Sequence, residues 1–334
     1  MNTIQSVTSK PLWHSSTVRL ALFAAVFTAI YKVMDNITMH NFITASDSLT
    51  AVFVYLIIGA WTGLLSSLLF SVLFGKRLID PDFVRLELNR KAFNKQAIIA
   101  GTITAGSTLF LLLGNQLGDP SVLIALGNAV IIYTLAYDAI TKQVTINQII
   151  LPALLVITGS MMSSYSGSLE ITLLGLLFVF VVSNGLTAVS EIVEQTGCRA
   201  SDGVNFFVWR FLWLAITGTS IALIVSFIRG YFGLLLNGLV DGVQYIPWIA
   251  LTMLFVFLGI GMKLVAKKND AVSVVLIVYS VQMILSYPIT IAGNWIIPGV
   301  FGQLPTDIWI WIVRIAGTIL MIWGVYRLRK QNPN

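Results

Sequence analysis

Ten stretches of this chain are apolar and long enough to cross a lipid bilayer, and this feature leaves few folds open. A bilayer core takes about 20 mostly apolar residues per helix, and 57% of the residues are hydrophobic while 10% are charged. Backbone groups inside lipid must bond within their own segment, so the sequence predicts an all-α polytopic membrane protein. The predicted spans are 18–34, 49–74, 96–113, 119–137, 145–162, 170–193, 206–229, 247–265, 271–287 and 307–326.

Basic residues fall on one side of these spans, which predicts their orientation. Cytoplasmic loops carry an excess of Lys and Arg, so both termini are expected in the cytoplasm. The same bias explains the formal net charge of +6 without a nucleic-acid partner. The residues on the predicted cytoplasmic side are Lys76, Arg77, Arg85, Arg90, Lys91, Lys95, Lys142, Arg199, Lys263, Lys267, Lys268, Arg327, Arg329 and Lys330, and little beyond Lys32 and Arg229 lies opposite.

A recurring pattern of acidic, proline and glycine positions divides the chain into two repeats, residues 1–165 and 166–334. Asp119 and Asp270 each follow a helix of similar length and open another across a short turn. One helix later, Pro152 and Gly159 are spaced seven apart, as are Gly317 and Gly324. Five helices per repeat is an odd number, so the second repeat enters the membrane with opposite orientation. The sequence therefore predicts two inverted five-helix repeats in one membrane unit, the design of many secondary transporters.

A short segment supports a family resemblance. Residues 137–148 read Tyr-Asp-Ala-Ile-Thr-Lys-Gln-Val-Thr-Ile-Asn-Gln, and Pro152 and Gly159 follow. With ten predicted spans, the chain resembles the drug/metabolite transporter superfamily, in particular its EamA-like exporters. The resemblance implies alternating access around a central cavity bounded by helices 1, 3, 4, 6, 8 and 9. It also implies export of a small organic solute, such as an amino acid, across a bacterial inner membrane.

Polar side chains inside predicted spans are the best pointers to a pathway, because lipid exposure of such groups is costly. We expect five of them to bind substrate around one central cavity at mid-membrane depth. The alternative is hydrogen bonding between helices, which such residues also provide. The five residues are Asn128, Tyr133, Asn184, Tyr279 and Gln282.

Charged residues inside spans are few in this prediction. Arg314 must meet water, a carboxylate or backbone carbonyls, and a structural role is favoured over binding an anionic substrate group. With so few buried cations, a neutral or zwitterionic substrate is favoured over a strongly anionic one. Three acidic residues end helices near the cytoplasmic boundary, where one could carry a coupling proton or pair with Lys142, Arg199 or Arg210: Asp138, Glu191 and Glu194.

The sequences of two connecting segments predict their structures. Asp80 and Pro81 can start a short interfacial helix that buries Phe83 and keeps Arg85 in water. Residues 288–305 are apolar but contain three prolines, so we expect them to leave the helix and fold over the outer mouth of the pathway. Trp295 is the expected gating residue; a passive loop among the headgroups is the alternative.

The motifs for other functions are missing from the sequence. No GxxxxGK[ST] loop is present, and His14 and His40 accompany no nucleophile or metal-ligand cluster. We therefore expect no enzyme activity, cofactor or metal. The expected partners are the small-molecule substrate and membrane lipids, and a homodimer through Gly59 and Gly63 stays open. The competing class is a membrane scaffold or lipid-handling protein that transports nothing.

Overall fold

A computed structural model describes residues 16–43, 47–87, 91–116, 126–165, 172–296 and 307–331, and all regular structure in these ranges is helical. The first half contains α1 (Ser16–Ile37), η2 (Thr38–Phe42), α2 (Ser48–Phe74), η3 (Gly75–Ile79), α3 (Lys91–Gln116), η4 (Gly127–Ala129), α5 (Val130–Ile140) and α6 (Ile146–Ser163). The second half contains α7 (Leu173–Leu176), η5 (Leu177–Ser183), α8 (Asn184–Ala200), α9 (Gly203–Ile228), α10 (Phe232–Gly242), η6 (Val243–Tyr245), α11 (Ile246–Asn269), α12 (Val272–Tyr279), α13 (Gln282–Ile296) and α14 (Ile308–Gln331).

Eight helical stretches in the described part are long and apolar enough to cross a membrane. An integral membrane protein is therefore the class that these helices indicate. The outer surfaces of these helices fit a lipid environment, because large apolar side chains such as Phe227, Ile228 and Ile308 are exposed. The helix α3 is also long but is not among the eight, and it packs against α8 and α9 inside the bundle.

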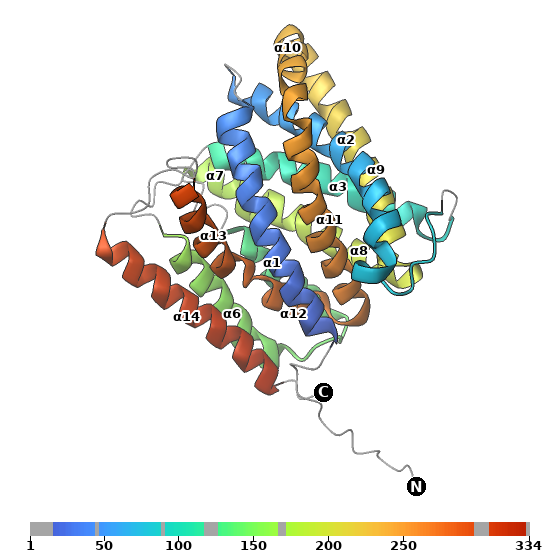
Figure 1. Ribbon diagram of the computed structural model, residues 1–334. Coiled ribbons are helices and arrows are strands. Elements are labelled where there is room, and N and C mark those ends of the chain that lie inside the picture. The colour runs from blue at the N-terminus through green and yellow to red at the C-terminus, as the bar shows by residue number, and fades with distance from the viewer. Residues whose placement is uncertain are drawn as a thin grey trace.

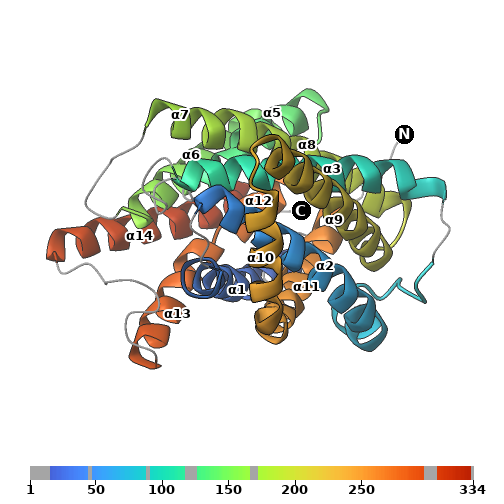
Figure 2. The same cartoon turned by 90° about the horizontal axis from the view of Figure 1, so that it is seen from above.

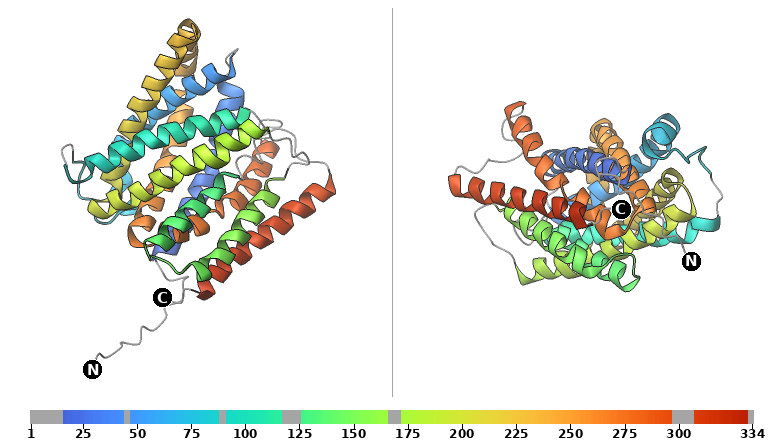
Figure 3. Two further views of the ribbon diagram at one scale, coloured as in Figure 1. Left: turned by 180° about the vertical axis from the view of Figure 1, so that it is seen from behind. Right: turned by 90° about the horizontal axis from the view of Figure 1, so that it is seen from below.

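Four helix pairs build the bundle. α1 packs beside α11 at the front in Figure 1, while α3 packs beside α8 at the back, as Figure 3 shows. The pair α6 and α14 closes one edge, and α2 packs against α9 at the other (Figure 2). The connections with most basic residues gather where α1 begins and where α8, α11 and α14 end. We call this side the basic end.

The pair α6–α14 is held by close backbone contact. A Cβ atom on Gly159 would lie 2.5 Å from the Gly317 carbonyl oxygen, and one on Gly317 would lie 2.5 Å from the Gly159 oxygen. Further along, a Cβ on Gly324 would lie 2.9 Å from the Pro152 oxygen. The two helices therefore run antiparallel, and the four positions that the sequence matched between the repeats meet at this crossing in crossed order, Gly159 against Gly317 and Gly324 against Pro152.

The predicted interfacial helix after Asp80 is wrong, because residues 80–87 form turns and extended chain. The Asp80 carboxylate accepts from the backbone N–H of Asp82 and of Gly203, at 3.0 and 2.7 Å. Asn205 accepts from Glu87 N and donates to Arg85 O. These bonds to α9 occupy the backbone groups that a helix would need. Phe83 is buried, as predicted.

The segment from Pro288 also differs from its prediction. Helix α13 continues through Pro288 to Ile296, so residues 288–296 do not leave the helix. The chain breaks earlier instead, at Ser280 and Val281, where α12 ends. Pro288 lies inside α13, where it removes the single backbone hydrogen bond to the Ile284 carbonyl without ending the helix. Residues 297–305 lie outside the described ranges, and Trp295 is 81% exposed.

Candidate functional site

Acidic residues of α8 and basic residues of α11 meet near the basic end of the bundle. Glu191 and Glu194 are three residues apart on α8, and Lys263 and Lys267 are four apart on α11. Each spacing places both side chains on one face of its helix. Because α8 and α11 are in contact, the acidic face of one helix faces the basic face of the other.

Glu191 binds both lysines of α11. Its Oε1 lies 2.7 Å from Lys263 Nζ, and its Oε2 lies 2.7 Å from Lys267 Nζ. One carboxylate thus bridges two successive turns of α11. The bridge joins α8 to α11 through two charge-assisted hydrogen bonds, the strong kind of polar contact.

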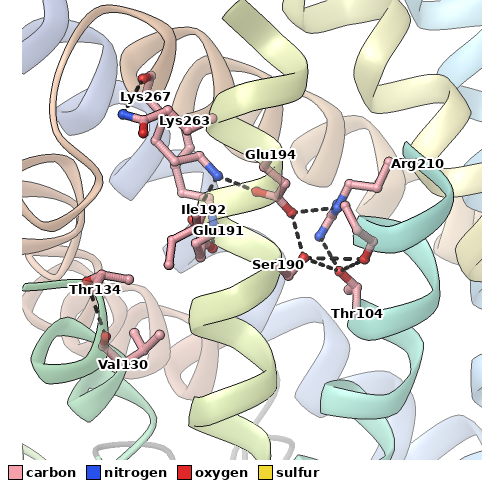
Figure 4. Close-up of polar contacts among 12 residues, drawn as sticks. Thr104, Val130, Thr134, Ser190, Glu191, Ile192, Glu194, Arg210, Lys263 and Lys267 are labelled. Carbon is pink, nitrogen blue, oxygen red and sulfur yellow. Dashed lines mark hydrogen bonds and ion pairs between the residues drawn. The ribbon is translucent and has the colours of Figure 1, made fainter. Parts of the chain in front are cut away.

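Glu194 connects this bridge to two further helices. Its carboxylate pairs with Lys267 on one side, and its Oε1 lies 2.6 Å from Arg210 Nε of α9 on the other. The Arg210 Nε–H is not directed at this oxygen, so the contact is an ion pair without a hydrogen bond. Arg210 Nη2 donates to Thr104 Oγ1 of α3 at 3.1 Å. Ser190 contacts both Glu194 and Thr104. Figure 4 shows Glu194 at the centre of these contacts, between Arg210 and the lysines.

The five charged groups form what we call the charge cluster: Glu191, Glu194, Arg210, Lys263 and Lys267. Their side chains are at most 10% exposed, and Lys267 is fully buried. Removing an ion from water costs several kcal/mol even after relaxation, so a buried cluster contributes little to stability for its size. Three cations face two carboxylates, which leaves one unit of positive charge in excess. Ionisable groups buried in a membrane bundle are candidates for a functional site.

A line of polar side chains on α1 continues from the cluster toward the opposite end. The Lys263 ammonium lies 4.9 Å from the centre of the Tyr279 ring. Tyr279 Oη donates to Thr28 Oγ1 at 2.8 Å and also hydrogen-bonds with Tyr31. One turn further along α1, the Tyr55 hydroxyl donates to the carboxylate of Asp35. These contacts, which we call the polar line, therefore connect the charge cluster with Thr28, Tyr31 and Asp35 of α1.

Three of the residues predicted to bind substrate lie together, away from the charge cluster. Asn128 donates to Ser160 Oγ at 2.6 Å, Asn184 donates to Leu126 O at 2.8 Å, and Tyr133 donates to Phe180 O at 3.0 Å. We call Asn128, Tyr133 and Asn184 the amide cluster. Each side chain makes a hydrogen bond that crosses between elements, which is the packing role that the sequence left open.

The other predicted residues lie elsewhere. Tyr279 contacts Thr28 and Lys263, as described above, and belongs to the polar line rather than to the amide cluster. Gln282 is buried, and its Oε1 has no hydrogen-bond partner. Trp295 is exposed on α13. The structure thus divides the predicted site residues into separate groups, and substrate contact stays a prediction for each.

Sequence reasoning missed most of the charge cluster. The pair of Glu194 with Arg210 was foreseen, but Lys263 and Lys267 were assigned to the cytoplasmic surface, and both are buried. The assumption of few buried cations is therefore wrong. The usable signal was the spacing of the acidic and basic pairs, which gives each helix one charged face.

Two other charged residues have structural partners. Arg314 Nε donates to the Tyr165 carbonyl oxygen at 2.8 Å, the kind of partner expected for a guanidinium in a span. Asp138 accepts from the backbone N–H of Ser273 at 2.8 Å and so caps the start of α12. It pairs with none of the basic residues proposed for it.

Comparisons with known proteins define the fold only. No family model matches the chain, and no curated protein matches it. One solved structure, described as "Crystal structure of protein", is similar with a TM-score of 0.60 over 94% of this chain and 97% of its own. At 11% identity, this likeness concerns the arrangement of helices and carries no function.

Proposed function

We propose that the protein is a secondary transporter that moves a small organic metabolite, such as an amino acid, by alternating access between two inverted repeats. The observation that carries the proposal is the charge cluster. It joins α8, α9 and α11 through buried ion pairs at one end of a membrane bundle, and a hydrogen bond from Arg210 to Thr104 adds α3. Intramembrane ionisable residues mark substrate and ion pathways in transporters.

Pairing between helices supports two inverted repeats. If α1, α2, α3, α5 and α6 correspond to α8, α9, α11, α12 and α14, the contact of α1 with α11 corresponds to that of α8 with α3. The pairs α2–α9 and α6–α14 each join a helix to its own counterpart. A two-fold axis in the membrane plane would produce this set of contacts.

Breaks within helices support the same correspondence. The 3₁₀ turn at Gly127–Ala129 interrupts the fourth predicted span, and the break at Ser280 interrupts the ninth. The offset of 151 positions that relates Asp119 to Asp270 also carries Asn128 to Tyr279. Thr28 of the first half bonds Tyr279 of the second, and Asn184 of the second half bonds Leu126 O, two residues before Asn128 of the first. Broken helices near the midplane are where transporters place their sites.

The charge cluster would act as the closed gate of this transporter. The ion pairs tie α8 to α11 and α9, so these helices cannot separate unless the charged groups lose their partners or meet water. The basic end would face the cytoplasm, because Lys and Arg concentrate there. In that orientation the structure is closed on the cytoplasmic side, and export would begin when the cluster opens.

Counterflow in proteoliposomes tests the proposal. Vesicles loaded with one unlabelled amino acid should accumulate its labelled form when they contain the protein. Glu191→Gln removes the bridge between the two lysines and should lower the counterflow rate by at least tenfold, because a gate with unpaired cations cannot close properly. Asp241→Asn is the matched control, since this exposed carboxylate on α10 has no part in the cluster. The competing scaffold or lipid-handling protein would give no counterflow with any metabolite.

Orientation has its own test. In a Cys198→Ala background, a cysteine at Arg77 should react with an impermeant thiol reagent only after the membrane is opened, whereas one at Arg229 should react in intact cells. The native Cys198 is buried, so its removal leaves the surface unchanged. Reaction of the Arg77 position from outside would reverse the proposed orientation.

A further inference from the structure

Lys32 is an exposed cation within a helix that is apolar enough to span the membrane. It lies five residues before the end of α1, which is about 7–8 Å along the helix axis. Among the described residues it makes no ion pair or hydrogen bond, and its side chain is exposed. An ammonium at such a depth is costly unless water or a partner reaches it.

The neighbours of Lys32 on α1 show which way its ammonium faces. Lys32 lies one turn after Thr28 and three residues before Asp35, so it shares their face of the helix. Thr28 binds Tyr279, whose ring lies 4.9 Å from the Lys263 ammonium of α11. A lysine that extended outward to the lipid headgroups would move away from Lys263, which is buried. The Lys32 ammonium therefore lies on the side of α1 that faces the bundle, near the outer limit of the polar line.

Neither neighbouring charged residue forms an ion pair with Lys32. The Asp35 carboxylate accepts from Tyr55, and Lys263, itself a cation, is paired with Glu191. Along the polar line and the charge cluster together, four cations accompany three carboxylates. One anionic group would balance this region and would find an accessible ammonium at Lys32, with the buried Lys263 behind it.

We propose that Lys32 and Lys263 form a binding site for the anionic group, a carboxylate or a phosphate, of the transported solute. Lys32 makes the direct contact, and Lys263 supplies a positive field from the buried side. The site rests on the proposed transport function. Of the neutral or zwitterionic substrates favoured by the sequence it keeps the zwitterionic class, and it adds the anionic class that the sequence disfavoured. A lipid headgroup offers the same chemistry, so the test must separate the two sources.

Chemical labelling of lysines tests the site without any transport. The purified protein in neutral detergent is reductively methylated, and the rate at Lys32 is compared with that at Lys76, an exposed lysine at the basic end that serves as an internal control. The probes share a 3-methylbutyl group: leucine, 4-methylpentanoate, 3-methylbutylamine and 3-methylbutanol. Inorganic phosphate is a fifth probe. A bound anionic group should slow methylation of Lys32 relative to Lys76, and this ratio corrects for reagent consumed by the amino groups of leucine and 3-methylbutylamine.

Variants then measure the contribution of Lys32. Lys32→Gln should weaken binding of the protecting anion roughly 10- to 100-fold, as expected for loss of a hydrogen bond to a charged group. Lys32→Arg should retain most of the affinity because it keeps the charge. Lys76→Gln removes one exposed lysine charge elsewhere and should have no effect. An exposed residue such as Lys32 can be replaced without disturbing the packed core.

Each outcome separates the inference from the proposed function. Protection by leucine, 4-methylpentanoate or phosphate, but not by the amine or alcohol, supports the site. Equal protection by the amine and the alcohol, or protection by no probe, overturns it even if counterflow is observed. Protection that occurs only in vesicles containing phosphatidylglycerol assigns the site to a lipid headgroup and also overturns it. Protection without counterflow keeps the site and rejects transport.

Discussion

The charge cluster and the amide cluster are both buried polar regions of one helix bundle, yet they are built from different chemistry. The amide cluster uses three neutral side chains, and each donates one hydrogen bond to a neighbouring element. The charge cluster uses five ionised side chains from three helices and adds Thr104 and Ser190. The first arrangement resembles ordinary contacts between membrane helices, and the second does not.

The free energy of burying polar groups differs between the amide cluster and the charge cluster. Interhelical hydrogen bonds in membranes contribute about 0.6 kcal/mol on average, which is a modest gain at little cost. Burying an ion costs several kcal/mol, and well-packed apolar residues often stabilise a protein more than an ion pair does. A bundle that needed only stability would have no reason to keep five buried charges. The proposed role as a gate would account for a charge cluster that is kept despite this cost.

The largest effect is expected from Glu194→Ala. This change leaves the fully buried Lys267 with one partner fewer and deprives Arg210 of its carboxylate. Loss of one partner from a buried pair costs about 3–5 kcal/mol, so the midpoint of thermal unfolding in detergent should fall sharply. Asn184→Ala is the comparison from the amide cluster. Equal losses in the two variants would remove the contrast between the regions.

A double-mutant cycle on Glu191 and Lys263 should show the next largest effect. Glu191→Gln leaves Lys263 without its carboxylate, and Lys263→Met leaves Glu191 with Lys267 alone, whereas the double variant removes both members of the pair. We expect the double variant to be more stable than the two single losses added together, with a coupling of about 0.5–3 kcal/mol. Unfolding of all four proteins in the same detergent measures this energy. A coupling near zero would mean that the pair is not formed in solution.

The amide cluster should tolerate change better. Asn128→Ala and Asn184→Ala each remove one interhelical hydrogen bond and should cost about 0.6–1.7 kcal/mol. Thermal unfolding measures the stability, and counterflow measures the function. If either variant unfolds normally but abolishes transport, that residue contacts the substrate as the sequence predicted, and the two clusters would share one function.

The smallest effect concerns pH and the carboxylate of Asp270, beside the basic end. Burial raises the pKa of Asp270, and the nearby Asp138 carboxylate raises it further, so the folded protein holds this proton more tightly than the unfolded chain. Stability from this group therefore increases as pH falls from the raised folded pKa toward the unfolded value of about 3.9. Asp270→Asn should be slightly more stable than the wild type at pH 7 and lose that advantage in acid. An advantage that grows in acid would contradict this sign.

Much of the bundle was predictable from local sequence. The apolar runs around Ala51 and Val256 indicate buried helices, and eight such stretches are long enough to span a membrane. The sequence matched Pro152 and Gly159 of α6 with Gly317 and Gly324 of α14, and the structure packs these positions together in crossed order, with Gly159 against Gly317. Local pattern failed at residues 80–87, where side chains of α9 bind the backbone. That competition depends on a helix more than 100 residues away in the chain.

The sequence alone determined which segments are apolar and which end of the bundle is basic, because both properties depend on composition along the chain. The tertiary structure decided which charges lose contact with water. Lys267 and Lys268 are neighbours near the end of α11, yet Lys267 is fully buried against Glu191 and Glu194, while Lys268 reaches the exposed Asp82. A helix turns by about 100° per residue, so adjacent lysines face different surroundings. Only the packing of α8 against α11 assigns one of them to the charge cluster.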